Sequence, residues 1–131
     1  MIILDASAGI ELFTRSQAGV RVHDLIADER VTVPAHFDVE IGSALRRMVR
    51  QRRIGSARAE EAVRLSVGYP AERAAITPLV IRAFALRDRF SAGDALYALL
   101  AKDLGATLVT CDVGLANASE GFAPVRHLPV G

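Results

Sequence analysis

The chain has 131 residues, of which 51% are hydrophobic and 24% charged, so it is long enough for one globular domain and too apolar to be disordered. Its formal net charge is +1, so bulk charge does not mark it as a nucleic-acid binder. The single cysteine excludes an intramolecular disulfide, and no apolar run reaches the roughly 20 residues that a membrane helix needs, so we expect a soluble cytoplasmic protein.

In chain order, strand patterns alternate with helix patterns. A continuous apolar run at residues 1–4 stops at Asp5, which is typical of a buried parallel strand. The predicted strands are 1–4, 31–33, 73–76, 106–110 and 124–126. The predicted helices are 8–15, 19–29, 37–53, 57–67, 77–87, 91–104 and a short one that ends at residue 118. This alternation predicts a single α/β domain over residues 1–131, with a parallel sheet of four or five strands covered by helices on both faces.

Four acidic residues fall at the same end of this predicted sheet. Asp5 ends the first strand, and Asp112 lies just past the strand at 106–110. Glu40 and Asp94 each lie in the first turn of a helix that follows a strand. If the first and fourth strands are neighbours, the four carboxylates meet in one cleft, where ligands bind in open parallel sheets.

Carboxylates gathered in one cleft repel one another unless a cation lies among them. A divalent metal ion such as Mg²⁺ or Mn²⁺ suits such oxygen ligands, and it can activate water for attack on a phosphate. Each acid also has a structural alternative. Asp5 and Asp112 could cap helices, Asp94 could form a capping box with Ser91, and Glu40 could be an ordinary helix-start carboxylate.

The segments that carry the four acids resemble the PIN domain, and in particular its VapC toxin branch. The four blocks are IILDASA at residues 2–8, VEIGSALRR at 39–47, SAGDALYALLA at 91–101 and LVTCD at 108–112. Their order and spacing match the family over nearly the whole chain. The resemblance implies an endoribonuclease dependent on Mg²⁺ or Mn²⁺ that leaves 5′-phosphate and 3′-hydroxyl ends.

The resemblance also assigns roles to residues and implies partners. Asp5, Glu40, Asp94 and Asp112 would be the catalytic metal ligands. Ser7 and Thr110 would support the acids through hydrogen bonds. The partners would be an RNA substrate, a cognate VapB-like antitoxin encoded beside the toxin, and a second copy of the chain in a homodimer. Arg46 and Arg87 are candidates for contact with RNA or antitoxin, because arginine matches phosphate and carboxylate geometry; the alternative is a solvated helix face.

Two other classes of protein remain as alternatives. One is a catalytically silent PIN-like module that binds RNA or protein without cutting it, which the presence of all four acids disfavours. The other is a phosphotransfer receiver, which needs a lysine after its fifth strand, whereas the only lysine, Lys102, falls in a predicted helix.

Overall fold

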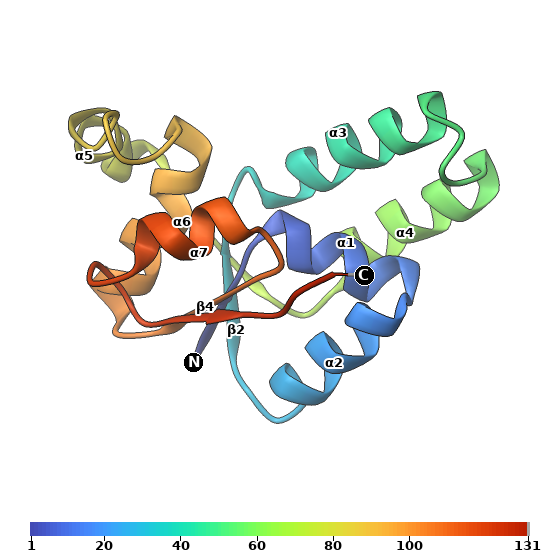
Figure 1. Cartoon of the computed structure of the whole chain (residues 1–131), viewed down its shortest axis with the longest axis horizontal. Coiled ribbons are helices and arrows are strands. Elements are labelled where there is room, and N and C mark those ends of the chain that lie inside the picture. The colour runs from blue at the N-terminus through green and yellow to red at the C-terminus, as the bar shows by residue number, and fades with distance from the viewer. Residues whose placement is uncertain (131) are drawn as a thin grey trace.

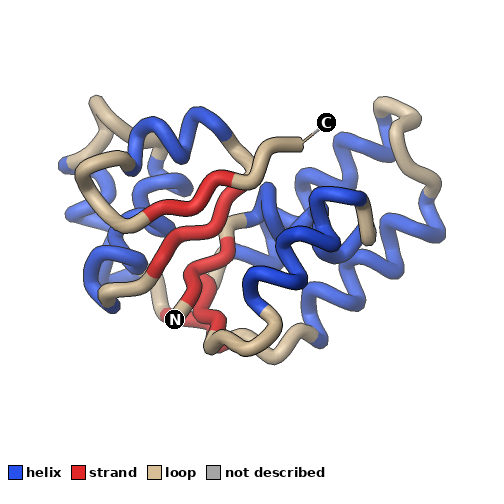
Figure 2. The backbone as a smooth tube through the Cα atoms, turned by 60° about the horizontal axis from the view of Figure 1, so that its bottom comes forward, coloured by secondary structure: helices blue, strands red, loops and turns tan. Residues whose placement is uncertain are grey.

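The computed structural model describes residues 1–130, and its centre is a five-stranded parallel sheet (Figure 2). The strands lie side by side in the order β3-β2-β1-β4-β5. Their bounds are β1 Ile2–Leu4, β2 Val31–Pro34, β3 Glu72–Ala74, β4 Thr107–Thr110 and β5 Val125–His127. All four neighbouring pairs are parallel, and the first strand pairs with the fourth through Leu4 and Val109. The first and fourth strands are therefore neighbours, as the predicted cluster of acids required.

Helices cover both faces of this sheet, as the sequence predicted (Figures 1 and 2). The helices are α1 Ala6–Thr14, α2 Gln17–Ile26, α3 Phe37–Arg50, α4 Ser56–Gly68, η1 Thr77–Leu79, α5 Val80–Ala85, α6 Ala92–Leu104 and α7 Val113–Ser119. Helix α1 packs against α2, α3 and α4, whereas α6 packs against β1, β2 and β4. Helices α3 and α4 extend from the body as an antiparallel pair (Figure 1). Among the described residues, no helix is long and apolar enough to cross a membrane.

Several predicted helices differ from the observed ones at their ends; α2, for example, was expected over residues 19–29 and spans Gln17–Ile26. Helix α3 was expected to continue to residue 53, but it ends at Arg50 because Arg52 adopts a left-handed conformation with φ of 58°. The helix expected over residues 77–87 is a 3-10 turn at Thr77–Leu79 followed by the short α5. The proline at position 78 favours this start, since its backbone nitrogen has no hydrogen to donate.

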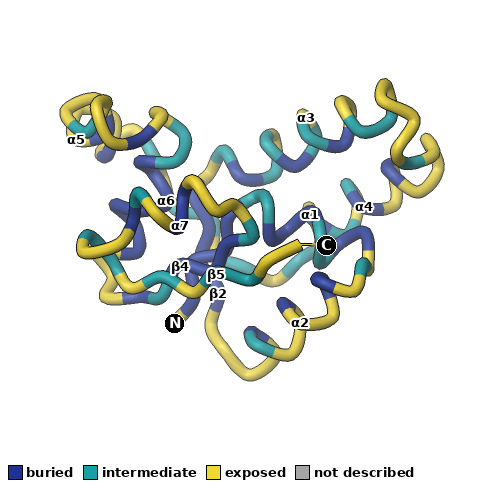
Figure 3. Tube along the Cα trace, in the orientation of Figure 1, coloured by how far each residue is buried: buried dark blue, intermediate teal, exposed yellow. Residues whose placement is uncertain are grey.

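The core is aliphatic, with Tyr97 and Phe37 as its largest fully buried side chains. Every residue of β1 and β2 is buried, and so is every residue of α6 from 95 to 101 (Figure 3). The least buried apolar surface is on α5, where Ile81 is 85% exposed and Phe84 66% exposed. This helix therefore presents a largely exposed apolar face, on which only the guanidinium of Arg87 lies over the ring of Phe84 among the described residues.

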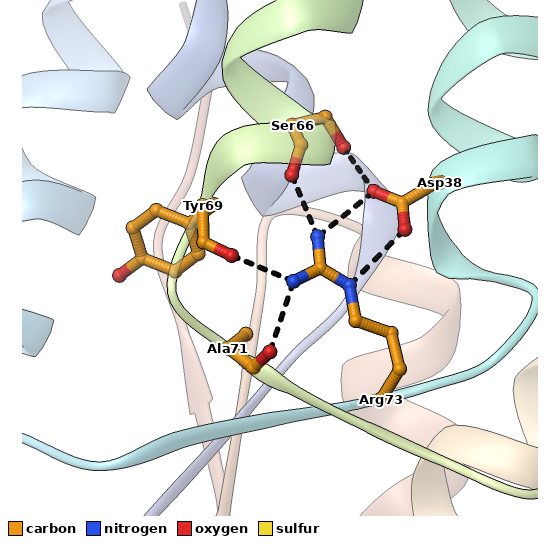
Figure 4. A network of polar contacts seen from close by, with 5 residues as sticks. All are labelled: Asp38, Ser66, Tyr69, Ala71 and Arg73. Atoms are coloured by element: carbon orange, nitrogen blue, oxygen red, sulfur yellow. Dashed lines mark hydrogen bonds and ion pairs between the residues drawn. The ribbon is translucent and has the colours of Figure 1, made fainter.

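A polar network joins α3, α4 and β3 beneath the helix pair (Figure 4). The guanidinium of Arg73 donates to both carboxylate oxygens of Asp38 at 3.1 Å and to the carbonyl oxygens of Ser66, Tyr69 and Ala71 at 2.6 to 2.9 Å. The Ser66 hydroxyl also donates to Asp38 at 2.7 Å. Burial alone would raise the pKa of Asp38, but the hydrogen bonds from Arg73 and Ser66 outweigh this effect, so the pKa lies below its ordinary value. The network fixes the start of α3, which carries Glu40.

Candidate active site

The four acids lie at the carboxyl end of the sheet, where the strand order reverses between β1 and β4. Asp5 directly follows β1, and Asp112 lies two residues after β4. Glu40 and Asp94 are in the first turns of α3 and α6. All four line a single pocket of about 410 Å³, together with residues of α1, α3 and α6. The structure thus brings together side chains that are up to 107 positions apart in sequence (from 5 to 112).

Asp5 is held by a dense set of hydrogen bonds. Its Oδ1 accepts from the backbone N–H of Ala8 at 3.0 Å and from the Ser7 hydroxyl at 2.8 Å, and its Oδ2 accepts from the Thr110 hydroxyl at 2.9 Å. Thr110 Oγ1 in turn accepts from the backbone N–H of Asp112 at 2.9 Å. Asp5 therefore caps α1 and lines the pocket at once, and the residues expected to support the acids, Ser7 and Thr110, lie against its carboxylate.

Glu40 is oriented by residues of two other segments. The hydroxyl of Tyr97 donates to Glu40 Oε1 at 2.6 Å, and His36 Nε2 lies 3.4 Å from the same oxygen. Gly93 gives the carboxylate its space, because a Cβ at this position would lie 2.9 Å from Glu40 Oε2. The position of the carboxylate is thus set by a donor on α6 and by the missing side chain of a residue next to Asp94.

His36, which directly precedes α3, is a further side chain beside the acids. Its ring packs against that of Tyr97, with centroids 5.0 Å apart, and its buried ring nitrogens have no hydrogen-bond partner among the described residues. The 3.4 Å distance to Glu40 is close enough for an ion pair but lacks hydrogen-bond geometry. His36 also lowers the pKa of Asp94 when it carries charge.

Asp112 and Asp94 combine a structural role with their place in the pocket. Asp112 Oδ1 caps α7 by accepting from the backbone N–H of Gly114 at 2.8 Å and of Leu115 at 3.2 Å. The Ser91 hydroxyl caps α6 by accepting from the backbone N–H of Asp94 at 3.2 Å. Helix N-termini carry partial positive charge, which helps to hold these carboxylates at the pocket.

The acids raise one another's pKa. Burial raises the pKa of Asp5 to about 6, with a further contribution from the charge of Asp112, although hydrogen bonds from Ala8, Ser7 and Thr110 oppose the shift. Burial also raises the pKa of Asp94, and the charges of Asp112 and then Glu40 add to this effect. A pocket that penalises its own negative charges in this way favours a bound cation.

The residues of the pocket fit a hard divalent cation. All of its acidic ligand atoms are carboxylate oxygens, which Mg²⁺ and Mn²⁺ prefer. Within residues 1–130, Asp112 Oδ2 and Glu40 Oε2 accept no hydrogen bond from the protein. Residues 1–130 contain no group of three or more acidic, histidine or cysteine side chains placed to hold a metal ion together. An ion in this pocket would therefore be held by one or two carboxylates and by water, which is the usual coordination of Mg²⁺ in proteins.

The arginines chosen from sequence lie away from the acids. Arg46 lines a different groove, between α3 and α4, and the exposed Arg87 lies over the ring of Phe84, with its guanidinium carbon 4.7 Å from the ring centroid. Neither lines the acid pocket. The arginine that does line it is Arg47.

The residues that sequence analysis missed share a helical face with the acids. His36 lies four positions before Glu40 and Arg47 seven after it, while Tyr97 lies three after Asp94. Residues at these spacings occupy the same side of a helix. Counting helical turns from each acid would have identified all three.

Comparisons with known proteins show what the chain is similar to. A family model described as "PIN domain" matches residues 2–121. Ribonuclease VapC12 of Mycobacterium tuberculosis is 38% identical over 126 residues, which cover 96% of this chain and 98% of the relative. VapC ribonuclease Mb0985 of Mycobacterium bovis is 35% identical over 130 residues, which cover 98% and 99%.

Solved structures show the same fold. The structure of PAE2754 from Pyrobaculum aerophilum matches with a TM-score of 0.69 and 25% identity, covering 95% of this chain and 81% of that one. VapBC2 from Rickettsia felis, bound to a DNA fragment from its promoter, matches with a TM-score of 0.66 and 12% identity, covering 97% and 98%.

Proposed function

Because the chain belongs to the PIN domain family, within its group of VapC ribonucleases, we propose that it is a metal-dependent endoribonuclease and the toxin of a toxin–antitoxin pair. The observation that carries this proposal is the single pocket lined by Asp5, Glu40, Asp94 and Asp112 at the switch point of the sheet. The reaction is hydrolysis of RNA phosphodiester bonds, with 5′-phosphate and 3′-hydroxyl ends, in the cytoplasm.

In this proposal the four acids hold one or more Mg²⁺ or Mn²⁺ ions. When bound, such an ion activates water and stabilises the charge that develops on the phosphate. The chain supplies the orientation. Ser7 and Thr110 donate hydrogen bonds that hold Asp5 in one conformation, and Tyr97 donates to one oxygen of Glu40 and leaves the other for a ligand. Orientation of this kind matters because catalysis depends on ligands being in place before the reaction starts.

Replacing Asp94 with asparagine tests the proposal, because α6 is capped by the Ser91 hydroxyl on the backbone N–H of Asp94, which asparagine retains, so the substitution should spare the fold. We expect the parent protein to cut RNA with Mg²⁺ or Mn²⁺ and to stop growth when expressed alone. Asp94→Asn should lose more than the roughly 10- to 100-fold that follows removal of a residue supporting a ligand. Asp88→Asn is the matched control, since Asp88 is exposed and lies outside the pocket.

The outcomes separate the enzyme from its alternative. Cleavage by Asp94→Asn at the parental rate would refute the proposed site. A parent protein that neither cuts RNA nor binds Mg²⁺ or Mn²⁺ in calorimetry would favour the catalytically silent binding module. Chelation with EDTA should abolish cleavage by the parent, and added Mg²⁺ or Mn²⁺ should restore it.

A groove between α3 and α4 supports the proposed antitoxin partner. It has a volume of about 350 Å³, and its floor is apolar, with Leu45, Val49 and Val63, while Arg46 and Arg50 also line it. Such a groove suits an apolar segment that carries acidic residues. Gly42 opens into it, and a Cβ there meets no atom within 4 Å. In co-purification with the product of the adjacent small gene, Gly42→Leu should release that partner, whereas Gly42→Ala should retain it.

The exposed face of α5 supports the proposed homodimer. Val80, Ile81 and Phe84 are 50%, 85% and 66% exposed on one short helix, which is unusual for large apolar side chains. In the proposed homodimer, this face packs against the same face of a second copy of the chain. Sedimentation of the parent should show a dimer, and Ile81→Glu should shift it to monomer. A parent that is monomeric at all concentrations would contradict the proposal.

A further inference from the structure

Arg47 lies at the edge of the acid pocket and has no partner of its own. It is exposed on α3, two helical turns after Glu40, and lines the pocket. Among residues 1–130, its guanidinium makes no ion pair and no hydrogen bond. It is also absent from the charges that lower the pKa of Asp5 and Asp94. Arg47 is therefore a cation beside four carboxylates that it does not neutralise, and it remains free for an anion.

A second hollow lies next to the acid pocket. It has a volume of about 330 Å³ and lies between α1 and α3, with Cys111, which follows β4, and Val130 also in its wall. Ser7, Ile10, Ala44 and Arg47 line both hollows, so the two are neighbours. We call this second hollow the α1–α3 groove.

The charge of the α1–α3 groove is suited to a polyanion. Arg53 lines it as well, because the left-handed Arg52 ends α3 and turns the chain at that point. The one acid in its wall is Glu11, whose carboxylate already accepts from the Ser16 hydroxyl at 3.0 Å. None of its lining residues is aromatic, so it offers no platform on which bases could stack.

We propose that the α1–α3 groove holds the RNA strand on one side of the scissile bond, with Arg47 and Arg53 binding its backbone phosphates. The inference rests on the proposed ribonuclease function and extends it to a substrate-binding path. Guanidinium groups match phosphate oxygens, and grooves of this kind follow a single strand through its charge. Because the groove lacks aromatic side chains, base stacking does not contribute to the contact, and we expect binding to depend mainly on the phosphate charge of the strand.

Binding of a labelled single-stranded RNA to the inactive Asp94→Asn protein tests this, because the RNA stays intact during the measurement. Fluorescence anisotropy should show that Arg47→Ala and Arg53→Ala each weaken binding by about tenfold at low salt, equally for RNAs of different sequence. Each substitution should also reduce the slope of log affinity against log salt by about 0.7, the value for one phosphate contact on a single strand.

Arg46→Ala and Arg50→Ala are the matched controls. They remove the same charge from the same helix but line the α3–α4 groove instead. We expect both controls to bind RNA as tightly as the Asp94→Asn protein. Equal losses for all four arginines would mean that only bulk charge matters, and would overturn the inference. So would Arg47→Ala and Arg53→Ala proteins that bind RNA normally but fail to bind the antitoxin.

RNA cleavage by proteins that retain Asp94 tests this inference separately from the function on which it rests. If the parent does not cut RNA, the proposed function fails irrespective of Arg47. If the parent cuts RNA and Arg47→Ala has the same KM and kcat, the proposed function stands and the inferred path is wrong. The expected result is a raised KM for both Arg47→Ala and Arg53→Ala.

Discussion

Replacing Arg73 with alanine removes the centre of the network that joins α3, α4 and β3 (Figure 4). The main loss is the ion pair with Asp38, because two of the three carbonyl oxygens keep a backbone donor. The N–H of Tyr69 still reaches the oxygen of Ser66 at 3.1 Å, and the N–H of Ala71 reaches that of Tyr69 at 2.8 Å. The free energy of unfolding should therefore fall mainly by the contribution of one bidentate pair.

Burial sets the size of this loss. Exposed ion pairs contribute about 0.2–1 kcal/mol, and breaking a buried pair costs about 3–5 kcal/mol. The side chains of Arg73 and Asp38 are 26% and 27% exposed, between these limits. We expect Arg73→Ala to lower the free energy of unfolding by about 2–3 kcal/mol. For a chain of this length, that corresponds to a fall in Tm of about 6–15 °C.

Urea unfolding at pH 7, followed by circular dichroism, measures the change. The matched control is Arg82→Ala, which also breaks a bidentate pair, with Asp103 at 2.7 and 2.9 Å, but on the exposed surface. Its loss should be much smaller because solvent screens the pair. Equal losses in the two variants, or a loss below about 0.5 kcal/mol for Arg73→Ala, would refute the reasoning. A double-mutant cycle with Asp38→Asn should show coupling of at least about 1 kcal/mol.

Three further predictions concern the site and the surface. Tyr97→Phe removes the donor to Glu40 and should lower kcat by about 10- to 100-fold with little change in KM, measured by RNA cleavage at saturating Mg²⁺. Gly93→Ala should displace the Glu40 carboxylate and weaken Mg²⁺ binding in calorimetry, while thermal unfolding shows a stability equal to or above that of the parent. Arg82 lowers the pKa of Asp103, so the stability lost in Arg82→Ala should be present above pH about 4 and vanish as pH falls through the folded-state pKa; a difference that persists at pH 2 would contradict this.

The architecture could be predicted from the sequence because alternating strand and helix patterns leave few possible topologies. The position of Asp5 and Asp112 directly after strands was sufficient to place both at one edge, once those strands were assumed to be neighbours. The end of α3 could not be predicted from the sequence. Its arginines continue a helical pattern to residue 53, and nothing local signals the left-handed conformation of Arg52.

The residues that surround the four acids could be predicted from the sequence only in part. The roles expected of Ser7 and Thr110 came from family resemblance, whereas the helical period counted from Glu40 indicates His36 and Arg47 without it. The pairing of Asp38 with Arg73 has no such local signal. These residues are 35 positions apart, and their contact depends on how the chain leaves α4 and enters β3.

The pairing of β1 with β4 joins the start of the chain to a segment that is synthesised late. Residues 107–110 must be in place before Thr110 can hold Asp5, and Asp112 follows them. A nascent polypeptide still short of this point carries three of the four acids but has no complete pocket. We therefore expect an unfinished chain to lack RNA-cleaving activity, and a finished chain in which β4 separates from β1 to lose it.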